Sequence, residues 1–141
     1  MSLIKERERR EIQKKFAALS NPVKLLMFTQ DFECEYCSVT RELLEELAGM
    51  SDRISVEVRD FVADAETAGK YGMDKIPATA VLGEKDYGIR FFGVPAGYEF
   101  ASLLDSIVDV GRRDPKLAPE LVSMLAAVDQ PVHVQVMVTP T

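Results

Sequence analysis

The feature that most constrains how this chain can fold is its pair of cysteines, Cys34 and Cys37, which are the only two in the sequence. An apolar run at 23–28 precedes the pair and is typical of a short buried strand. After the pair, apolar residues recur on one helical face at Val39, Leu43, Leu44 and Leu47. Gly49 follows where a left-handed C-cap is expected. The cysteines are therefore predicted to lie at a strand-to-helix junction, with Cys34 at or just before the first helical turn.

The chemistry of this position favours a reactive sulfur at Cys34. Unpaired backbone N–H groups and the helix dipole stabilise negative charge there, which lowers the pKa of a free cysteine from about 8.5 toward neutrality. A thiolate at neutral pH is a nucleophile, so Cys34 is predicted to attack a partner disulfide. Cys37 lies one turn along the same face and is predicted to resolve the mixed disulfide, which releases the partner reduced.

Three other interpretations of the spacing compete with redox chemistry: half of a zinc site, an inert structural disulfide, or two buried core thiols. Zinc in proteins takes about four ligands. The chain has no second cysteine pair and a single histidine, His133, which is distant in sequence and is expected to be an ordinary strand residue. We predict no metal site and interpret the pair as redox-active, because this motif beside a strand-helix-strand pattern is typical of redox proteins.

Composition limits the class of protein. The chain has 141 residues, of which 47% are hydrophobic, enough for one sizeable core. It has no apolar run long enough to span a membrane and no charged-then-apolar leader, so we expect a cytoplasmic location, where thiols are normally kept reduced. The net charge of −6 argues against nucleic acid as a partner. No cofactor is predicted.

The remaining elements follow from the periodicity of the apolar residues. A first helix is expected over 5–15 with a buried stripe of Ile12, Phe16 and Leu19, and its interspersed glutamates favour a solvated face over a basic binding arm. After the redox helix come a strand at 54–61, a short helix at 64–71, strands at 79–82 and 87–92, and a helix from about 100 to 111. The first two strands should be parallel because a helix connects them, and the last two antiparallel because their loop is short.

The element order βαβαββα, with the cysteine motif after the first strand and Ile76-Pro77-Ala78-Thr79 before the third, resembles the thioredoxin and glutaredoxin superfamily. The resemblance implies an α/β thioredoxin-like fold, in which a central mixed sheet of four strands is flanked by helices, here with an extra amino-terminal helix. It also implies that Pro77 is cis, lies beside the cysteine pair, and leaves the backbone of Ile76 to pair with a substrate chain. Tyr36, between the cysteines, completes the predicted substrate-binding set. A trans proline that starts an edge strand is the alternative at Pro77.

The end of the chain repeats its beginning. A shift of 109 positions lays 11–23 over 120–132 without a gap, with apolar residues at matching places. The identical pairs are Glu11/Glu120, Ala17/Ala126, Ala18/Ala127, Pro22/Pro131 and Val23/Val132. Two unrelated helix-proline-strand segments are the alternative to a true repeat. If the repeat is true, residues 1–113 form one thioredoxin-like domain, residues 114–141 are the truncated start of a second, and a second redox loop should begin near position 143.

Tandem units of this kind resemble the protein disulfide oxidoreductases of thermophilic bacteria and archaea. The resemblance rests mainly on the Cys-x-Tyr-Cys loop and on the segment 91–110, and it identifies the chain with the amino-terminal unit of that family. It implies that the full-length protein reduces, forms or isomerises protein disulfides. It also implies a flavin-dependent, thioredoxin reductase-like electron donor.

Glu35 departs from the relatives in a way that bears on mechanism. It stands where thioredoxins have Gly and glutaredoxins have Pro, and together with Asp31 and Glu33 it crowds Cys34 with negative charge. Nearby carboxylates disfavour a thiolate. Cys34 should therefore be less acidic than a glutaredoxin nucleophile, and the pair should be reducing rather than strongly oxidising.

Two further departures concern the surroundings of the pair. Phe28 stands where thioredoxins bury a proton-relaying Asp, and Glu57 on the adjacent strand is a candidate substitute, with a solvated edge carboxylate as the alternative. Glutaredoxins grip glutathione with a Gly-Gly and acidic pair after the last strand. The segment 93–97 does not match that pattern, which argues against a glutathione-dependent protein.

Three functions are consistent with these features. The first is a thiol-disulfide oxidoreductase that acts on proteins through Cys34 and Cys37. The second is an electron-relay domain that feeds a peroxidase, similar to the amino-terminal domain of the alkyl hydroperoxide reductase flavoprotein. The third is a non-catalytic binding module. The apolar alternation at 132–138 also predicts a strand, which is expected to pair two copies in a homodimer or to stay unpaired while a helix at 117–128 still packs.

Overall fold

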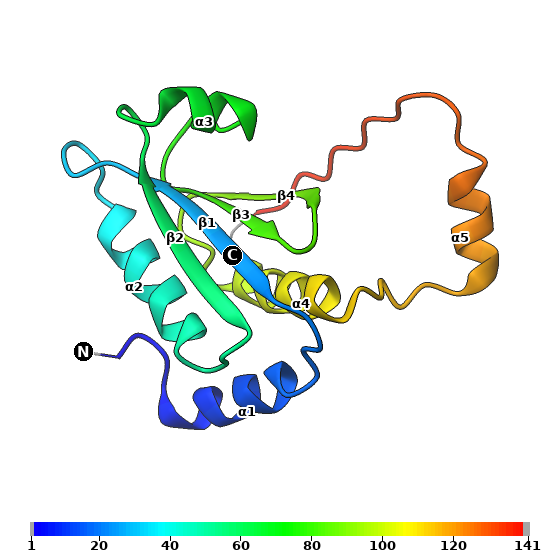
Figure 1. Ribbon diagram of the computed structural model, residues 1–141, viewed down its shortest axis with the longest axis horizontal. Coiled ribbons are helices and arrows are strands. Elements are labelled where there is room, and N and C mark those ends of the chain that lie inside the picture. Colours follow the sequence, from blue (N-terminus) through cyan, green and yellow to red (C-terminus); the bar gives the residue numbers. More distant parts are fainter. Residues whose placement is uncertain (1, 140–141) are drawn as a thin grey trace.

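The structure, a computed structural model, describes residues 2–139. Its centre is a four-stranded sheet in the order β2-β1-β3-β4 (Figure 1). The strands are β1 (Val23–Thr29), β2 (Ile54–Asp60), β3 (Ala78–Leu82) and β4 (Asp86–Phe92). β1 runs parallel to β2 and antiparallel to β3, and β3 runs antiparallel to β4. The predicted strand relations and the mixed α/β sheet are confirmed.

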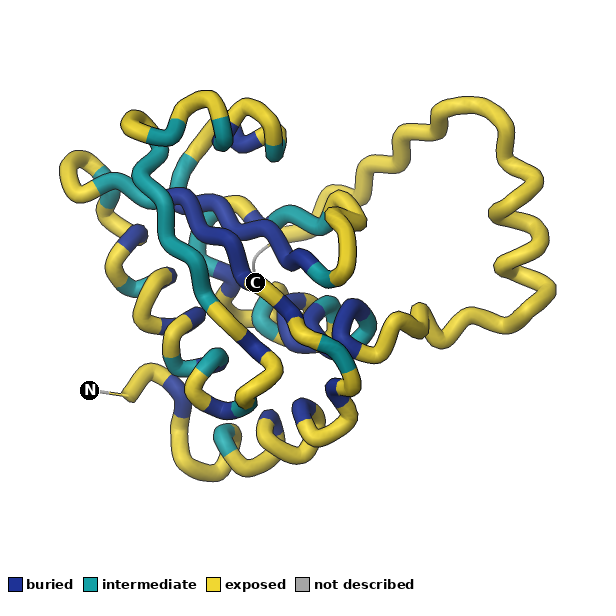
Figure 2. The backbone as a smooth tube through the Cα atoms, in the orientation of Figure 1, coloured by how far each residue is buried: buried dark blue, intermediate teal, exposed yellow. Residues whose placement is uncertain are grey.

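Four helices cover the two faces of this sheet: α1 (Glu6–Phe16), α2 (Cys37–Ala48), α3 (Ala65–Lys70) and α4 (Tyr98–Arg112). A further helix, α5 (Pro119–Ala126), lies apart from the sheet (Figure 1). The main core lies between one face of the sheet and α1, α2 and α4, whereas a smaller cluster lies between the other face and α3 (Figures 1 and 2). No helix within residues 2–139 is both long enough and apolar enough to cross a membrane.

The burial of strand β1 explains why its residues are apolar at successive positions instead of alternating with polar ones. It lies between β2 and β3, so both of its edges are paired, and an apolar cluster covers each of its faces. Leu25 and Met27 point into the main core, and Leu26 and Phe28 point into the smaller cluster. A strand that is buried on both faces needs apolar side chains at successive positions. Phe28, at the position where a buried carboxylate was considered, is fully enclosed by apolar neighbours.

The end of helix α2 differs from the expectation. Gly49 has a right-handed conformation, with φ of −65°, rather than the left-handed one that was predicted. Its N–H group bonds to the carbonyl of Glu45, and the N–H groups of Met50 and Ser51 continue with bonds to residues three positions earlier. These bonds satisfy the last carbonyls of the helix in a tightened final turn, so a left-handed residue is not required.

Gly111 on α4 fixes the connection between α1 and β1. Its carbonyl accepts hydrogen bonds from the backbone N–H groups of Ser20 and Asn21, and a third from the side-chain amide of Asn21 at 2.9 Å. A Cβ atom at position 111 would collide with the side chain of Leu19. Glycine at this position therefore leaves room for Leu19 to pack closely against α4.

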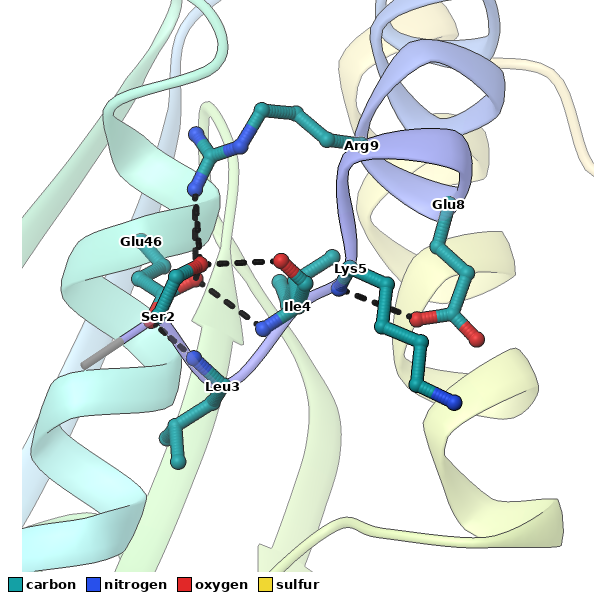
Figure 3. A network of polar contacts seen from close by, with 7 residues as sticks. All are labelled: Ser2, Leu3, Ile4, Lys5, Glu8, Arg9 and Glu46. Atoms are coloured by element: carbon teal, nitrogen blue, oxygen red, sulfur yellow. Dashed lines mark hydrogen bonds and ion pairs between the residues drawn. The ribbon is translucent and has the colours of Figure 1, made fainter.

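Glu46 of α2 holds the amino-terminal segment in place (Figure 3). Its carboxylate accepts hydrogen bonds from the N–H groups of Leu3 and Ile4 and from the hydroxyl of Ser2, and it pairs with the guanidinium of Arg9 at 3.3 Å. Burial alone would raise the pKa of Glu46, but these donors outweigh it and hold the pKa below its ordinary value. The network joins α1 to the carboxyl-terminal half of the helix that begins at Cys37.

We expect Glu46→Gln to lower the free energy of unfolding by about 1–2 kcal/mol at pH 7, because several donors lose a charged acceptor. The folded-state pKa lies below the unfolded one, so this stabilisation is present above the unfolded pKa and is lost as pH falls through the folded pKa. Urea denaturation from pH 7 to pH 3 should show the difference between the two proteins shrinking. Glu45→Gln is the matched control, because its exposed pair with Arg41 contributes little.

The segment after α4 does not pack as α1 does. All residues from 112 to 139 are exposed, including the apolar side of α5 (Figure 2). The expectation that a helix at 117–128 packs against the first unit is therefore wrong. Residues 132–138 are extended and exposed, but no strand assignment falls there. In the first unit, α1 already packs against α4 and the main core.

Candidate redox site

Four loops meet at one edge of the sheet. Thr29 at the end of β1 is opposite Asp60 at the end of β2, and Phe28 is opposite Ala78 at the start of β3. Ala78 in turn is opposite Phe92 at the end of β4. The loops 30–36, 61–64, 72–77 and 93–97 therefore all leave or enter the sheet at this edge. The first carries Cys34 and the third carries Pro77, as the resemblance implied.

The cysteines form a disulfide at this edge. Cys34 and Cys37 are bonded, with their Cα atoms 5.5 Å apart. Cys37 is the first residue of α2, and Cys34 precedes it in the turn that leads to the N-cap residue, Tyr36. Cys34 thus lies just before the helix, within the range that was predicted, and the open N–H groups of the first turn of α2 lie on its side of the helix.

The two sulfur-bearing residues differ in their exposure. Cys37 is only 3% exposed, whereas Cys34 is partly exposed. The start of α2 is fixed by the buried Thr40, whose N–H and hydroxyl groups both bond to the carbonyl of Tyr36, the hydroxyl at 2.7 Å. An external disulfide can therefore reach Cys34 more readily than Cys37.

The loop before Cys34 has an unusual backbone. Glu33 has a left-handed conformation, with φ of +56°. Such a conformation costs a residue with a side chain on the order of 1 kcal/mol. Beside Glu33, Phe32 has 79% of its surface exposed. Sequence reasoning did not select Phe32, because periodicity says nothing about a side chain in an irregular loop.

Exposed apolar side chains surround the disulfide edge. They come from the cysteine loop, the loop after β2, the end of β4 and the start of α4, and they are Phe32, Tyr36, Val62, Phe92 and Tyr98. Tyr36 was predicted from the resemblance, but the other four were not. They lie in four separate segments of the chain, so only the fold shows that they share one edge. We call this set the apolar rim.

The third loop carries the Ile76-Pro77 bond, which is cis. The carbonyl of Pro77 accepts a hydrogen bond of 2.8 Å from the N–H group of Gly93. Ile76 is partly buried against the smaller apolar cluster. The sheet register places this loop at the same edge as the cysteine loop, as the resemblance implied.

Glu57 is not placed at the disulfide. It lies three residues before the end of β2, and its carboxylate binds the ammonium of Lys24 at 2.8 Å and the guanidinium of Arg59 at 2.7 Å. The hydrogen bond from Lys24, followed by that from Arg59, holds the pKa of Glu57 below its ordinary value. These contacts favour the alternative interpretation, a solvated carboxylate in an ion-pair network, over a modulator of the cysteines.

The acidic residues of the cysteine loop are all exposed. Asp31, Glu33 and Glu35 face solvent. Among the described residues, none of the three forms a direct ion pair, but Asp31 lies close enough to Arg41 to affect its pKa. The hydrogen bond with Glu45 raises the pKa of Arg41, and the charge of Asp31 raises it more weakly. Arg41 therefore offsets part of the negative charge on one side of the loop.

Comparison with known proteins identifies this arrangement. No protein-family model matches the chain. The chain is 36% identical over 87 residues to a probable thioredoxin from Methanothermobacter marburgensis, and the match covers 60% of this chain and 96% of that protein. The chain belongs to the thioredoxin family.

The chain is also similar to a part of two larger proteins. An NADH dehydrogenase from Bacillus subtilis is 32% identical over 93 residues, which are 64% of this chain and 16% of that protein. The alkyl hydroperoxide reductase component AhpF from Staphylococcus epidermidis is 30% identical over 103 residues, which are 72% of this chain and 18% of that protein. The chain thus spans less than a fifth of the length of these two relatives.

Solved structures with a similar fold agree with this family assignment. The NTD_N/C domain of the alkylhydroperoxide reductase AhpF from Enterococcus faecalis superposes with a TM-score of 0.81 at 27% identity, over 90% of this chain and 62% of that chain. A protein disulfide oxidoreductase from Aeropyrum pernix gives a TM-score of 0.76 at 23% identity, over 87% of this chain and 54% of that chain, which shows a shared fold. The predicted thioredoxin-like fold class and the recognition of an amino-terminal, tandem-type unit are confirmed.

The acidic loop generates a prediction about the nucleophile of this thioredoxin-like unit. In the reduced protein, Glu35→Lys should lower the pKa of Cys34, because it replaces a neighbouring negative charge with a positive one that stabilises the thiolate. Thiolate absorbance measured against pH gives the shift directly.

Glu42→Lys is the matched control, because it makes the same charge change at an exposed position of α2, beyond Cys37. Equal titration curves for wild type and Glu35→Lys would mean that solvent screens the loop carboxylates from the sulfur.

Proposed function

We propose that this thioredoxin-like unit is a thiol-disulfide oxidoreductase that acts on proteins through Cys34 and Cys37. The observation that carries the proposal is the unequal exposure of the two cysteines at an edge surrounded by the apolar rim. A buried resolving sulfur and an accessible attacking sulfur are what two-step disulfide exchange requires. The apolar rim is suited to an unfolded or extended protein segment rather than to a small polar disulfide.

The proposed reaction has two displacement steps. The thiolate of Cys34 attacks one sulfur of the substrate disulfide, a mixed disulfide forms, and the other substrate sulfur leaves as a thiolate and takes up a proton. Cys37 then loses its proton and attacks Cys34, which releases the second substrate sulfur. Two electrons pass to the substrate, and the protein is left with the Cys34–Cys37 disulfide. A thioredoxin reductase-like donor returns those electrons, and the reverse sequence forms disulfides.

The substrate-binding role of Tyr36, Ile76 and Pro77 is part of the proposal. Pro77 and Ile76 lie on the loop that shares the edge with the cysteines, and Tyr36 is an exposed member of the apolar rim. The backbone of Ile76 would pair with the extended substrate chain, and Tyr36 would cover its apolar side chains. Such backbone pairing gives affinity without demanding a particular sequence.

The roles of the two cysteines can be tested by substitution. Cys37→Ser should accumulate a mixed disulfide with a protein substrate, because the resolving sulfur is gone, whereas Cys34→Ser should form none. Insulin reduction driven by a thioredoxin reductase should fall to background for both variants. Mass mapping of the reduced wild type after brief alkylation at neutral pH should show label on Cys34, and preferential labelling of Cys37 would reverse the assignment.

An electron-relay role is the second candidate function. It is favoured by the similarity to the alkyl hydroperoxide reductase component AhpF, in which the matching part is a small share of a longer protein. The insulin assay separates the candidates. Turnover of insulin supports the first function, reduction of a peroxidase but not of insulin supports the relay, and no turnover of either supports a non-catalytic binding module.

We also propose that residues 114–138 begin a second unit. The apolar residues of α1 are buried, whereas those at the repeat-equivalent positions of α5 are exposed; for Phe16 and Leu125 the exposed fractions are 3% and 60%. The same sequence pattern thus lacks the sheet and helix that cover it in the first unit. This supports the division at 113 and explains why 132–138 is extended but unpaired.

Truncation tests this division. A chain that ends at Arg113 should keep the free energy of unfolding of the longer chain within about 0.5 kcal/mol, because the removed residues are exposed. Sedimentation of both chains should show that any homodimer depends on the apolar segment 132–138 and is absent after truncation. A loss well above 1 kcal/mol, with the 132–138 amides protected from hydrogen exchange in the longer chain, would instead mean that the segment packs on the first unit.

A further inference from the structure

Arg90 is the most enclosed of the charged side chains that border the loop 71–77. Its side chain is 17% exposed and lies on the face of the sheet that carries α3. Its guanidinium forms two hydrogen bonds with the carboxylate of Asp86, one of them at 2.8 Å. Nε donates to the carbonyl of Tyr71 at 2.9 Å, and the guanidinium carbon lies 5.6 Å from the centre of the Tyr71 ring. A planar cation is thus held on three sides.

The orientation of Arg90 depends on Asp86 and on an irregularity in β4. Residues 86 and 90 of β4 are opposite Leu82 and Ala80 of β3, so β4 contains extra residues between them. Gly88, within this bulge, has φ of +84°, and its N–H group bonds to the Asp86 carboxylate. The hydrogen bond from Arg90 lowers the pKa of Asp86 to about 2, although burial acts in the opposite direction. Asp86 therefore stays charged at neutral pH. The bulge therefore brings the carboxylate and guanidinium into a forked pair.

The contacts of β4 fall at both ends and in the middle of the loop 71–77. At the start, Arg90 binds the carbonyl of Tyr71, the C-cap residue of α3. In the middle, the ammonium of Lys75 lies 5.0 Å from the centre of the Phe92 ring. At the end, the N–H group of Gly93 binds the carbonyl of Pro77 at 2.8 Å. Residues 90–93, which are the last three residues of β4 and the residue after it, thus act as a frame for the loop that carries Ile76.

We propose that Arg90, oriented by Asp86, is a positioning residue that sets the backbone of Ile76 for pairing with a protein substrate. The inference rests on the proposed function and adds a residue that lies outside the cysteine loop. Backbone pairing needs donor and acceptor groups within a few tenths of an ångström of their places. The other two contacts of the frame are a cation beside an exposed ring and one hydrogen bond. Arg90 supplies the fixed point at the start of the loop.

The test compares a protein disulfide with a small one. Arg90→Gln should raise KM for insulin about tenfold with kcat nearly unchanged, because a misplaced Ile76 backbone loses about one hydrogen bond to the substrate. The rate with DTNB, a small aromatic disulfide that needs no backbone pairing, should be unchanged. Arg90→Lys keeps the charge but not the fork and should restore only part of the insulin KM. Lys85→Gln is the matched control, because Lys85 is an exposed cation on the same hairpin.

Hydrogen exchange gives a readout that does not depend on activity. The N–H group of Met73 bonds to the carbonyl of Ala68 at one end of the loop, and that of Gly93 bonds to Pro77 at the other. Both amides should exchange about tenfold faster in Arg90→Gln if Arg90 holds the loop.

Three outcomes would overturn the inference. If exchange at Met73 and Gly93 is unchanged in Arg90→Gln, the frame does not depend on Arg90. If exchange rises but KM for insulin stays the same, or if the DTNB rate falls equally, Arg90 has a structural role only. If wild type reduces DTNB but no protein disulfide, the proposed function fails, and the positioning role fails with it.

Discussion

The burial of β1 on both faces is the constraint on which the rest of the structure depends. Because β1 lies between β2 and β3, its end decides which loops meet at the redox edge. The cysteine loop leaves β1 directly, and the Pro77 loop enters β3 opposite Phe28. A central strand that shifted by one residue would exchange its two apolar faces, which the cores on both sides would oppose. The relative position of the cysteines and Pro77 is thus set by core packing, not by contacts at the site.

The surroundings of the disulfide show why this arrangement suits exchange chemistry. Cys37 is held in the first turn of α2, where Thr40 bonds the carbonyl of Tyr36, while Cys34 lies in a loop whose neighbours face solvent. One sulfur is therefore rigid and shielded, and the other can be approached. The carboxylates of the acidic loop and the N–H groups at the start of α2 are expected to act in opposite directions on a thiolate at Cys34. We predict that the balance between them sets how readily the pair donates or accepts electrons.

The sequence was sufficient for the elements that repeat a local pattern. The apolar run of β1, the face of α2 and the alternation of β2 predicted their structures, and the motif order led to the family. The contacts that the sequence did not reveal join residues far apart in the chain. Glu46 binds residues 2–4, and Arg90 binds Tyr71, and no local periodicity marks either pair. Gly49 was predicted wrongly because a C-terminal glycine permits a left-handed conformation without requiring one. Phe32 and Tyr98 lie at positions whose exposure only the fold determines.

The repeat between α1 and α5 separates what a local sequence determines from what a partner surface determines. Both segments are helices, because the apolar spacing and the flanking residues favour helix formation in each. Only α1 is buried, because Gly111 and Leu19 let it approach α4 closely and Glu46 holds the segment before it. The same pattern in α5 has no equivalent surface within residues 2–139. Helix formation is thus encoded in each copy, whereas burial is a property of the unit to which the copy belongs. An extended apolar segment such as 132–138 follows the same rule, since a strand is completed only by the sheet that it joins.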